Sequence, residues 1–390
     1  MRVLYLLSKI LQVAAIPYAL QEMGHEVGVY PHTIEEIDEN DVLKEEFDTF
    51  VKSNSLNLIM STSFCTHAAE YSHQYGIKYA VYGMDSPQFE VWKSQARYDN
   101  VYLFLLDSRE CQFLRENGYK NAWYMPLAIR DTSHLILTQN DVRQYATDVS
   151  FVGSVYTHNP FDDLHELITD EMEEQTMQLL ERAAFIWDGA DHITELLERQ
   201  LNSDWQKLSR NLRRTYMGIE EDTPETYLLK HFVIDRKLTN VERCMILELL
   251  AEQYDFRLYT RDGEIVSPKI HRFGEVDSDS EALKVFAASK INLNLTLRSI
   301  EVGLPLRIFD IMSMGGFVLT DFREDAEALF QENKEIVMYK TPEEMVDKIN
   351  YYLGHDTERV QIGNNARNKV EKEFTYRVQL TKMIKKIQKY

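Results

Sequence analysis

Cysteine is scarce in this chain of 390 residues, and no pair of cysteines has the spacing of a zinc or redox motif. The three residues Cys65, Cys111 and Cys244 are far apart and odd in number. This usage excludes a disulfide framework and a cysteine-based zinc site. Because unpaired thiols fit a reducing compartment, we expect a cytoplasmic protein.

The sequence also lacks a long uncharged hydrophobic run, since no stretch of about 18 apolar residues occurs. Lys9 and Gln12 interrupt the apolar start, so residues 1–20 predict a strand and a helix rather than a signal peptide. The basic C-terminal stretch leaves two readings, a peripheral contact with anionic lipid or the solvated face of a helix. We favour the solvated face and expect no membrane span.

Positive charge is in short supply, because 43 Lys and Arg oppose 63 Asp and Glu, for a formal net charge of −20. Such a balance repels polyphosphate backbones, so nucleic acid is not an expected partner. The length exceeds that of one ordinary core and predicts two domains.

Short apolar runs alternate with helical patterns along the chain, as in doubly wound parallel sheets. Strands are expected at Val3–Leu7, His25–Tyr30, Leu56–Ser61, Tyr79–Tyr82, Val101–Leu106, Asp148–Gly153, Phe256–Thr260, Ile291–Leu295 and Phe317–Asp321. The predicted fold class is therefore α/β, with two Rossmann-like domains facing a cleft at the carboxyl ends of their strands.

Four segments divide the predicted chain. Residues 1–130 form the N-terminal Rossmann-like domain, and residues 131–147 form a linker without a clean period. Residues 148–372 form the C-terminal domain, with a helical insertion over about 162–250. Residues 373–390 form a helix that we expect to pack back on the N-terminal domain.

The segment Ile291–Asp321 predicts a strand, a loop and a helix that begins near Pro305. Arg307 falls in the first turn of that helix, where a cation opposes the helix dipole at a cost of about 0.3–1 kcal/mol. A bound anion would reverse the cost, so Arg298, Arg307 and the Gly303 backbone suggest a diphosphate cradle. The alternative is an ordinary ion pair between Arg307 and Asp310. Spacing alone leaves both readings open.

The stretch from His271 to Asp321 resembles the donor-binding half of GT-B glycosyltransferases, specifically the CgeB-like spore-maturation family and its group 1-like C-terminal module. The N-terminal motifs GMDSP (Gly83–Pro87) and Leu105–Ala128 resemble the domain that accompanies this module. Several residues match the family pattern: FVGS (Phe151–Ser154), Gly274, Arg307, Gly315 and Gly316.

The resemblance implies a donor site for a nucleotide sugar. Its nucleotide and phosphate contacts would be Ser154, Arg261, Arg298, Gly303, Arg307 and, toward the ribose, Asp310. Further candidates are Gly153, Ser299 and His271. Many relatives carry two glutamates spaced EX7E, whereas here Asp310 falls out of that register with Glu301, which we leave unassigned.

A general base would come from the N-terminal domain. Asp85 in the GMDSP motif is the candidate base, although Asp-Ser-Pro is also a common turn. His67 is a further candidate, for which a structural role is the commoner explanation. The triplet Asp277–Asp279 could hold a metal but precedes a helical run, so we predict helix capping and no metal.

The sequence thus predicts a metal-independent glycosyltransferase of the hexosyltransferase type (EC 2.4). It would move a sugar from a nucleotide diphosphate-sugar, with a UDP-sugar as the expected donor, to a hydroxyl on a glycan, protein or small-molecule acceptor. The nucleotide sugar is a substrate, and no cofactor is expected. Two alternatives stay open, a non-catalytic GT-B-like binding or scaffold protein and a sugar-nucleotide epimerase.

Overall fold

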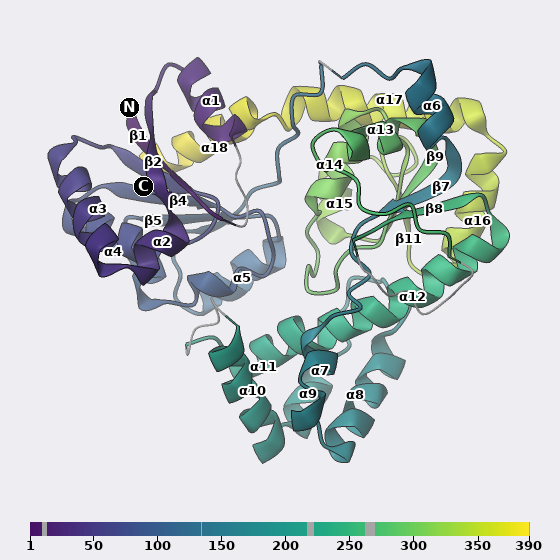
Figure 1. The fold of residues 1–390 in the computed structure, drawn as a ribbon, viewed down its shortest axis with the longest axis horizontal. Helices are drawn as coiled ribbons and strands as arrows, with labels where there is room; N and C mark the ends of the chain where they lie inside the picture. The colour runs from purple at the N-terminus through teal and green to yellow at the C-terminus, as the bar shows by residue number, and fades with distance from the viewer. Residues whose placement is uncertain (10–13, 134, 217–221, 262–269, 390) are drawn as a thin grey trace. The chain divides into compact units, whose positions relative to one another are not determined.

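The computed structural model describes residues 1–9, 14–133, 135–216, 222–261 and 270–389. Two compact units make up the chain (Figure 1). The first unit comprises Met1–Arg130, Met217–Thr223 and Glu373–Tyr390, and the second comprises Asp131–Tyr216 and Pro224–Lys372.

The first unit is built on a parallel sheet of six strands in the order β2-β1-β3-β4-β5-β6. The strands are β1 (Arg2–Leu7), β2 (Glu26–Thr33), β3 (Leu58–Ser61), β4 (Lys78–Tyr82), β5 (Val101–Leu105) and β6 (Ala122–Tyr124). The helices are α1 (Ala15–Glu22), α2 (Ile34–Glu39), α3 (Asp41–Ser53), α4 (Thr66–Gln74), α5 (Ser108–Glu116) and α18 (Tyr376–Lys389), with 3-10 turns η1 (Phe89–Val91) and η2 (Ser94–Arg97).

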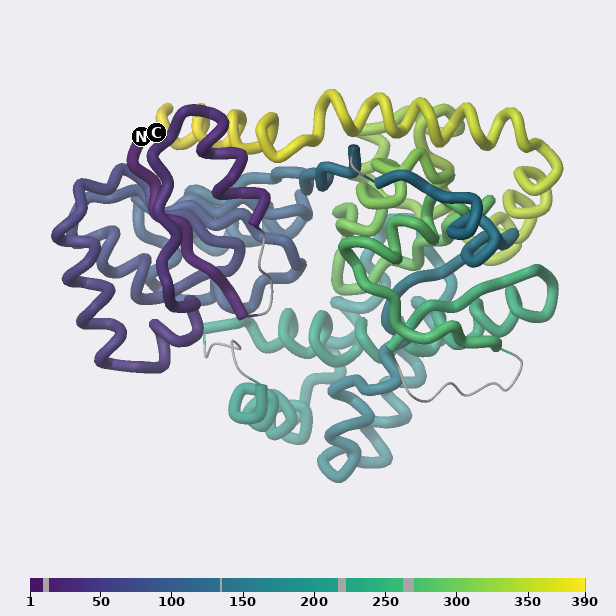
Figure 2. The backbone as a smooth tube through the Cα atoms, turned by 45° about the horizontal axis from the view of Figure 1, so that its top comes forward, coloured from purple at the N-terminus to yellow at the C-terminus, as the bar shows by residue number. Residues whose placement is uncertain are grey.

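The C-terminal helix α18 belongs to this first unit, where it packs against α1. The Lys78 ammonium donates to the carbonyl of Ile387, and Lys386 lies 5.0 Å from the ring centre of Trp123. The side chain of Gln388 lies 4.0 Å from the Met1 sulfur, and Figure 2 shows α18 passing close to the start of the chain. At least one lysine of the basic stretch therefore packs on an aromatic ring.

The second unit has a parallel sheet of five strands in the order β11-β10-β9-β7-β8. The strands are β7 (Thr147–Val152), β8 (Phe256–Tyr259), β9 (Ser289–Asn294), β10 (Val318–Asp321) and β11 (Val337–Tyr339). Their apolar side chains form one core that includes Val149, Leu258, Ile291, Leu319 and Val337, each fully buried. Burial on both faces explains the continuous apolar runs of the sequence.

The helices of the second unit are α6 (Gln139–Tyr145), α7 (Pro160–Asp163), α8 (Asp170–Ala183), α9 (Thr194–Gln200), α10 (Ser203–Thr215), α11 (Glu225–Leu228), α12 (Asp235–Gln253), α13 (Glu281–Ala288), α14 (Leu306–Ser313), α15 (Glu324–Leu329), α16 (Pro342–Leu353) and α17 (Asp356–Glu373), with the turn η3 (His165–Leu167). Some of these helices, among them α12, α13, α14 and α16, pack on the five-stranded sheet. A π-helical segment, η4 (Leu229–Ile234), joins α11 to α12 without a break.

The predicted α/β class, with two parallel doubly wound sheets and a helical insertion in the second, is confirmed. The insertion runs from α7 to α12 between β7 and β8, and α12 lies between the sheet and the helices α7–α9 (Figure 1). The region predicted as a linker carries α6. A capping box between Thr138 and Asp141 starts that helix, because each side chain accepts the backbone N–H of the other residue.

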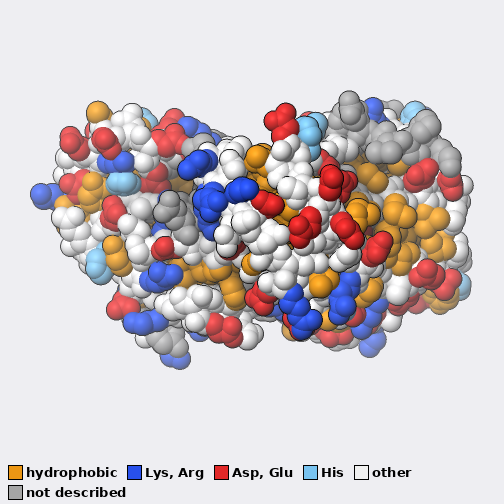
Figure 3. All heavy atoms as spheres, turned by 90° about the horizontal axis from the view of Figure 1, so that it is seen from below, with side chains coloured by type: hydrophobic (Ala, Val, Ile, Leu, Met, Phe, Trp, Pro, Cys, Tyr) orange, Lys and Arg blue, Asp and Glu red, His pale blue; other side chains and the backbone are white. Residues whose placement is uncertain are grey.

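Basic and acidic side chains are intermixed on the face drawn in Figure 3. This face therefore does not form a uniformly acidic surface, although the chain has more acidic than basic residues. Among the described ranges, no helix is long and apolar enough to cross a membrane.

Candidate functional site

The strand order of the second sheet defines one switch point. Read along the chain, the order is 2-1-3-4-5, so β7 and β9 are neighbours whose following connections run to opposite sides of the sheet. In open α/β sheets, ligands bind outside the carboxyl ends of the strands at this point. Two segments meet there, Gly153–Ser154 after β7 and residues 295–305 after β9, which we call the β9–α14 loop.

One side of the β9–α14 loop is held by the end of β10. Asp321 Oδ1 accepts both the backbone N–H of Thr296 at 2.9 Å and its hydroxyl at 2.8 Å. Arg323 pairs with Asp321 and donates from Nη1 to the carbonyls of Ile300 at 2.6 Å and Glu301 at 3.2 Å. Asp321 and Arg323 are buried, at 0% and 4% exposed. Such charge-assisted bonds in a dry environment fix the loop backbone.

The opposite side of the loop is held by α12. Thr239 Oγ1 accepts the backbone N–H of Arg298 at 3.0 Å. The Arg243 guanidinium donates to two carbonyls, Leu295 at the end of β9 and Ser154 after β7, the latter at 2.5 Å. Arg243 therefore joins the two connections that part at the switch point.

Arg298 is engaged inside the protein. Its Nε donates to Glu242 Oε2 at 2.7 Å and its Nη2 to Oε1 at 2.5 Å, and Nη1 donates to the carbonyl of Ile186 at 2.8 Å. The guanidinium also lies 5.2 Å from the ring centre of Trp187. Because its fork is already filled by a carboxylate, the structure corrects the prediction of Arg298 as a phosphate ligand and gives it a role in holding the loop.

A buried cluster of charges meets the same loop at Glu301. Lys230 Nζ lies 2.9 Å from Glu301 Oε1 and 3.3 Å from Asp235 Oδ2, and His231 Nδ1 lies 3.0 Å from the same Asp235 oxygen. Burial opposes the charged form of Lys230, but the two carboxylates outweigh it and raise the pKa of the ammonium. Burial likewise opposes the charged carboxylates, but Lys230 lowers the pKa of Asp235 and of Glu301 below the ordinary range.

Helix α14 begins directly after the loop, with Pro305 as its N-cap. Arg307 is half-buried in the first turn, and its guanidinium lies 5.4 Å from the ring centre of Phe286 on α13. Asp310 lies one turn farther along and is 5% exposed. The structure thus places Arg307 where a helix N-terminus favours an anion.

The glycines that end α14 have a packing role. Gly315 adopts a φ of +72°, which favours glycine, and a Cβ on Gly316 would lie 2.7 Å from the Phe286 carbonyl oxygen. Gly363 on α17 packs against the same turn, where a Cβ on Gly363 would meet the Gly315 carbonyl oxygen. These glycines let three helices approach the start of β10.

The other predicted donor residues lie at the same edge of the sheet. Gly153 and Ser154 follow β7, and Ser154 Oγ accepts the backbone N–H of Tyr156 at 3.0 Å. Ser299 and Gly303 are buried within the β9–α14 loop. The structure therefore brings Gly153, Ser154, Ser299, Gly303 and Arg307 to one switch point.

Arg261 lies just after the carboxyl end of β8, and His271 lies next to Arg272, which forms a bridge with Leu258 of β8. Both Arg261 and His271 are exposed. The Arg261 side chain is 77% exposed and lies 3.4 Å from Glu275. His271 packs edge-on against Phe273, with ring centres 4.6 Å apart. Both positions stay predictions as donor contacts.

Asp277 organises a turn before α13. Its Oδ1 accepts the backbone N–H of Asp279 at 3.1 Å and the Ser280 hydroxyl at 2.6 Å. The carboxylate closes this turn rather than capping α13 directly, since Ser280 is the N-cap. Across the described ranges, no three His, Cys, Asp or Glu side chains are grouped to hold a metal ion.

In the first unit, the two acid–base candidates occupy different settings. Asp85 is exposed in the GMDSP loop, which is anchored by the buried Glu110 through the Ser86 hydroxyl at 2.6 Å and the Gln88 N–H at 2.8 Å. His67 is half-buried at the start of α4, with Nδ1 3.0 Å from Asp38 Oδ1. Asp38 also accepts the N–H groups of Thr66 and His67 and so caps α4.

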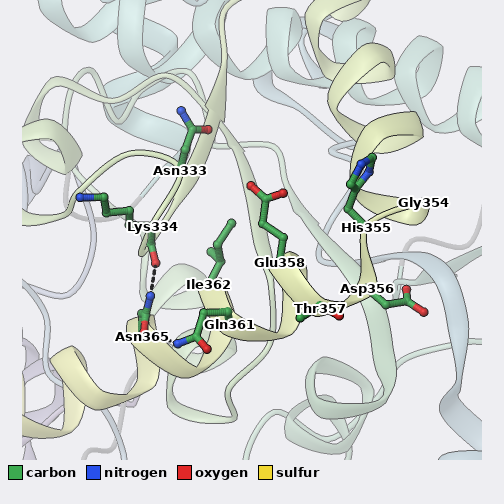
Figure 4. Close-up of a pocket in the computed structure, with 10 residues that line it drawn as sticks. All are labelled: Asn333, Lys334, Gly354, His355, Asp356, Thr357, Glu358, Gln361, Ile362 and Asn365. Atoms are coloured by element: carbon green, nitrogen blue, oxygen red, sulfur yellow. Dashed lines mark hydrogen bonds between the residues drawn. The ribbon is translucent and has the colours of Figure 1, made fainter.

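A surface pocket of about 730 Å³ lies elsewhere in the second unit (Figure 4). Its lining comes from the segment before β11, including Asn333 and Lys334, and from the segment after α16, including His355 and Glu358. Both segments are at the amino-terminal edge of the sheet, opposite the switch point. This pocket is therefore not part of the site built by the β9–α14 loop.

Sequence reasoning missed the residues that support the site: Lys230, His231, Asp235, Glu242, Arg243, Asp321 and Arg323. A local signal existed for two of them, because Asp321 ends a predicted buried strand and Arg323 lies two residues beyond it. The others come from a helix more than 50 residues away from the loop, as the separation of 56 between Glu242 and Arg298 illustrates.

Comparisons with known proteins agree with this fold. Residues 238–385 match the family described as Glycosyl transferase-like. No curated protein matches the chain. Among solved structures, HepE (Alr3699) of Anabaena in complex with UDP and glucose has a TM-score of 0.54 at 12% identity, covering 100% of both chains. A glycosyltransferase of Rickettsia africae has a TM-score of 0.52 at 13% identity, covering 100% of this chain and 98% of its own.

A further similar structure is AviGT4, a glycosyltransferase of avilamycin A biosynthesis, with a TM-score of 0.52 at 11% identity over 100% of this chain and 97% of its own. Identities this low establish the fold alone. The fold is that of GT-B glycosyltransferases, as the sequence predicted.

Proposed function

We propose that this protein is a glycosyltransferase of the CgeB-like family that binds a nucleotide diphosphate-sugar at the switch point of its second unit. The observation that carries the proposal is the position of Arg307 in the first turn of α14, directly after a loop fixed from both sides. UDP-bound structures share the fold, which supports a UDP-sugar as the donor and a hexosyltransferase reaction.

The site supports transfer chemistry through charge placement. The diphosphate would lie against the N-terminus of α14, with the Arg307 fork on its oxygens. As the bond between the sugar and the diphosphate breaks, negative charge develops on the leaving oxygen, and fixed dipoles and a cation stabilise it. The nucleotide sugar is then a substrate, and the proposed reaction needs neither a cofactor nor a metal.

The remaining roles belong to the proposal as well. Gly303, Ser154 and Ser299 would contact phosphate or sugar, and Asp310 the ribose. Asp85 or His67 would take the proton from the acceptor hydroxyl, on a glycan, a protein or a small molecule. We place the reaction in the cytoplasm.

Thermal-shift measurements test donor binding, because a ligand specific to the folded state raises the melting temperature by mass action. UDP, GDP, ADP, CMP and their sugars are compared, and we expect the largest shift from UDP and a UDP-sugar. Calorimetry then compares wild type with Arg307→Ala, which should weaken binding by about 10- to 100-fold, the effect of one charge-assisted hydrogen bond.

Arg199→Ala is the matched control, because Arg199 is an exposed arginine of α9 that pairs with Glu195 on the same helix. Its affinity should equal that of wild type. The proposal fails if no nucleotide or nucleotide sugar shifts the melting temperature, or if Arg307→Ala binds as tightly as wild type. Product analysis by NMR separates transfer from epimerisation, since only transfer requires an acceptor.

A further inference from the structure

The π-helical segment Leu229–Ile234 places two side chains, Lys230 and His231, against one carboxylate, that of Asp235. In an α-helix, side chains five residues apart lie on different faces, so Lys230 and His231 would not both reach Asp235. The wider π turn brings both to Asp235 Oδ2, at 3.3 Å and 3.0 Å. Single π turns inside α-helices recur at functional sites.

The cluster closes on Glu301 of the β9–α14 loop. Lys230 Nζ lies 2.9 Å and His231 Nε2 lies 3.9 Å from Glu301 Oε1. The side chains of Lys230, His231 and Asp235 are at most 7% exposed, whereas that of Glu301 is 19% exposed. Glu301 is thus the member nearest to solvent, and it lies two residues before Gly303.

Burial of so many charges argues for a role beyond stability. A buried ion pair adds little stability compared with well-packed apolar residues, but it imposes a strict geometry on its members. Here the geometry is completed from the other side, since Arg323 donates to the carbonyls of Ile300 and Glu301. The backbone of Glu301 is held by Arg323, two residues after β10, and its side chain by Lys230 of the π segment.

We propose that Lys230 and His231 are positioning residues, which hold Glu301 and thereby the β9–α14 loop in the conformation that receives the nucleoside diphosphate. The inference rests on the proposed function for the identity of the ligand. The ordering of the loop by the π segment does not depend on the proposed function.

Lys230→Met tests the ordering, with Lys369→Met as a matched control. Lys369 also forms a partly buried ion pair, with Glu335 at 3.1 Å, but at the amino-terminal edge of the sheet. Without ligand, amide hydrogen exchange in residues 296–304 should accelerate about tenfold or more in Lys230→Met. The control should exchange there as wild type does.

Affinity for UDP, measured by calorimetry, tests the part of the inference that concerns nucleotide binding. Lys230→Met should bind about tenfold more weakly, because a misplaced loop loses its prealigned contacts. Lys230→Arg, which keeps the charge, should recover part of that loss. If Lys230→Met does not fold, Glu301→Gln keeps the acceptor oxygen and removes the charge, and the same two measurements apply.

A cluster that is only structural gives a different result. Lys230→Met then lowers the melting temperature, while loop exchange and UDP affinity stay at their wild-type values, and the inference is overturned. If wild type binds no nucleoside diphosphate at all, the proposed function fails. The exchange measurement alone then decides whether the π segment orders the loop.

Discussion

Arg298 and Glu242 form a two-pronged ion pair, with Nε 2.7 Å from Oε2 and Nη2 2.5 Å from Oε1. The side chains are 13% and 5% exposed. The pair links the β9–α14 loop to α12 across 56 residues of sequence. An arginine that looked like a phosphate ligand is therefore part of the scaffold.

Arg298→Leu should lower the free energy of unfolding by about 3–5 kcal/mol, because it leaves the Glu242 carboxylate buried and unpaired. Urea denaturation measures the loss. The double variant Arg298→Leu/Glu242→Leu should recover much of it, since no buried charge is left without a partner. Additive losses in the double variant would show that the two side chains are not coupled.

Arg307→Ala should change stability little, in contrast to Arg298→Leu. Removing the cation relieves its repulsion by the helix dipole, about 0.3–1 kcal/mol, and forfeits the contacts of a half-buried side chain, among them that with the Phe286 ring, of similar size. Urea denaturation of the ligand-free protein should therefore agree with wild type within about 1 kcal/mol. A loss of several kcal/mol would mean that Arg307 is structural.

The Lys230 cluster predicts a dependence of stability on acid. The pKa values of Asp235 and Glu301 lie below their unfolded values, so their contribution is complete above about pH 5 and is lost as the pH falls through the folded pKa values. The raised pKa of Lys230 keeps its contribution complete up to about pH 10. Urea midpoints measured from pH 7 to pH 3 should fall less steeply for Glu301→Gln than for wild type.

Gly363→Ala should not stabilise the protein, although alanine is the better helix former. The propensity gain is about 1 kcal/mol, but the new Cβ would overlap the Gly315 carbonyl oxygen. Forcing an atom into a packed backbone contact costs about 1–3 kcal/mol, so the net effect is a loss or close to zero. The neighbouring Asn364→Ala is the control, because Asn364 is exposed on the same helix and should gain a few tenths of a kcal/mol. A stabilised Gly363→Ala would contradict the packing described.

The sequence was sufficient for the strands that are buried on both faces. Asp148–Gly153 and Ile291–Leu295 are continuous apolar or alternating runs, and both form strands within two residues of the prediction. β11 was missed because three residues, Val337–Tyr339, are too short for a periodic signal. Helix α6 was missed because its capping box lies in a stretch without a clean apolar face.

The candidate site, like the fold, could be predicted from the sequence only in part. The helix start at Pro305 and the position of Arg307 could be predicted, since both follow from local sequence rules. The partner of Arg298 could not, because the pairing depends on where α12 crosses the loop. Sequence reasoning sees a cation near a predicted ligand, but only the fold shows that a carboxylate has already filled its fork.

The π segment also fixes the rotational register of the long helix that contains it. Lys230 and His231 lie in this segment, while Thr239, Glu242 and Arg243 follow it. All five contact the connections at the carboxyl ends of the strands or the charged cluster beside them. Deleting one residue between 229 and 234 would return the helix to α geometry and turn α12 by about 100°. Glu242 and Arg243 would then face away from the loop, so a single-residue deletion here would uncouple one half of the helix from the site that the other half contacts.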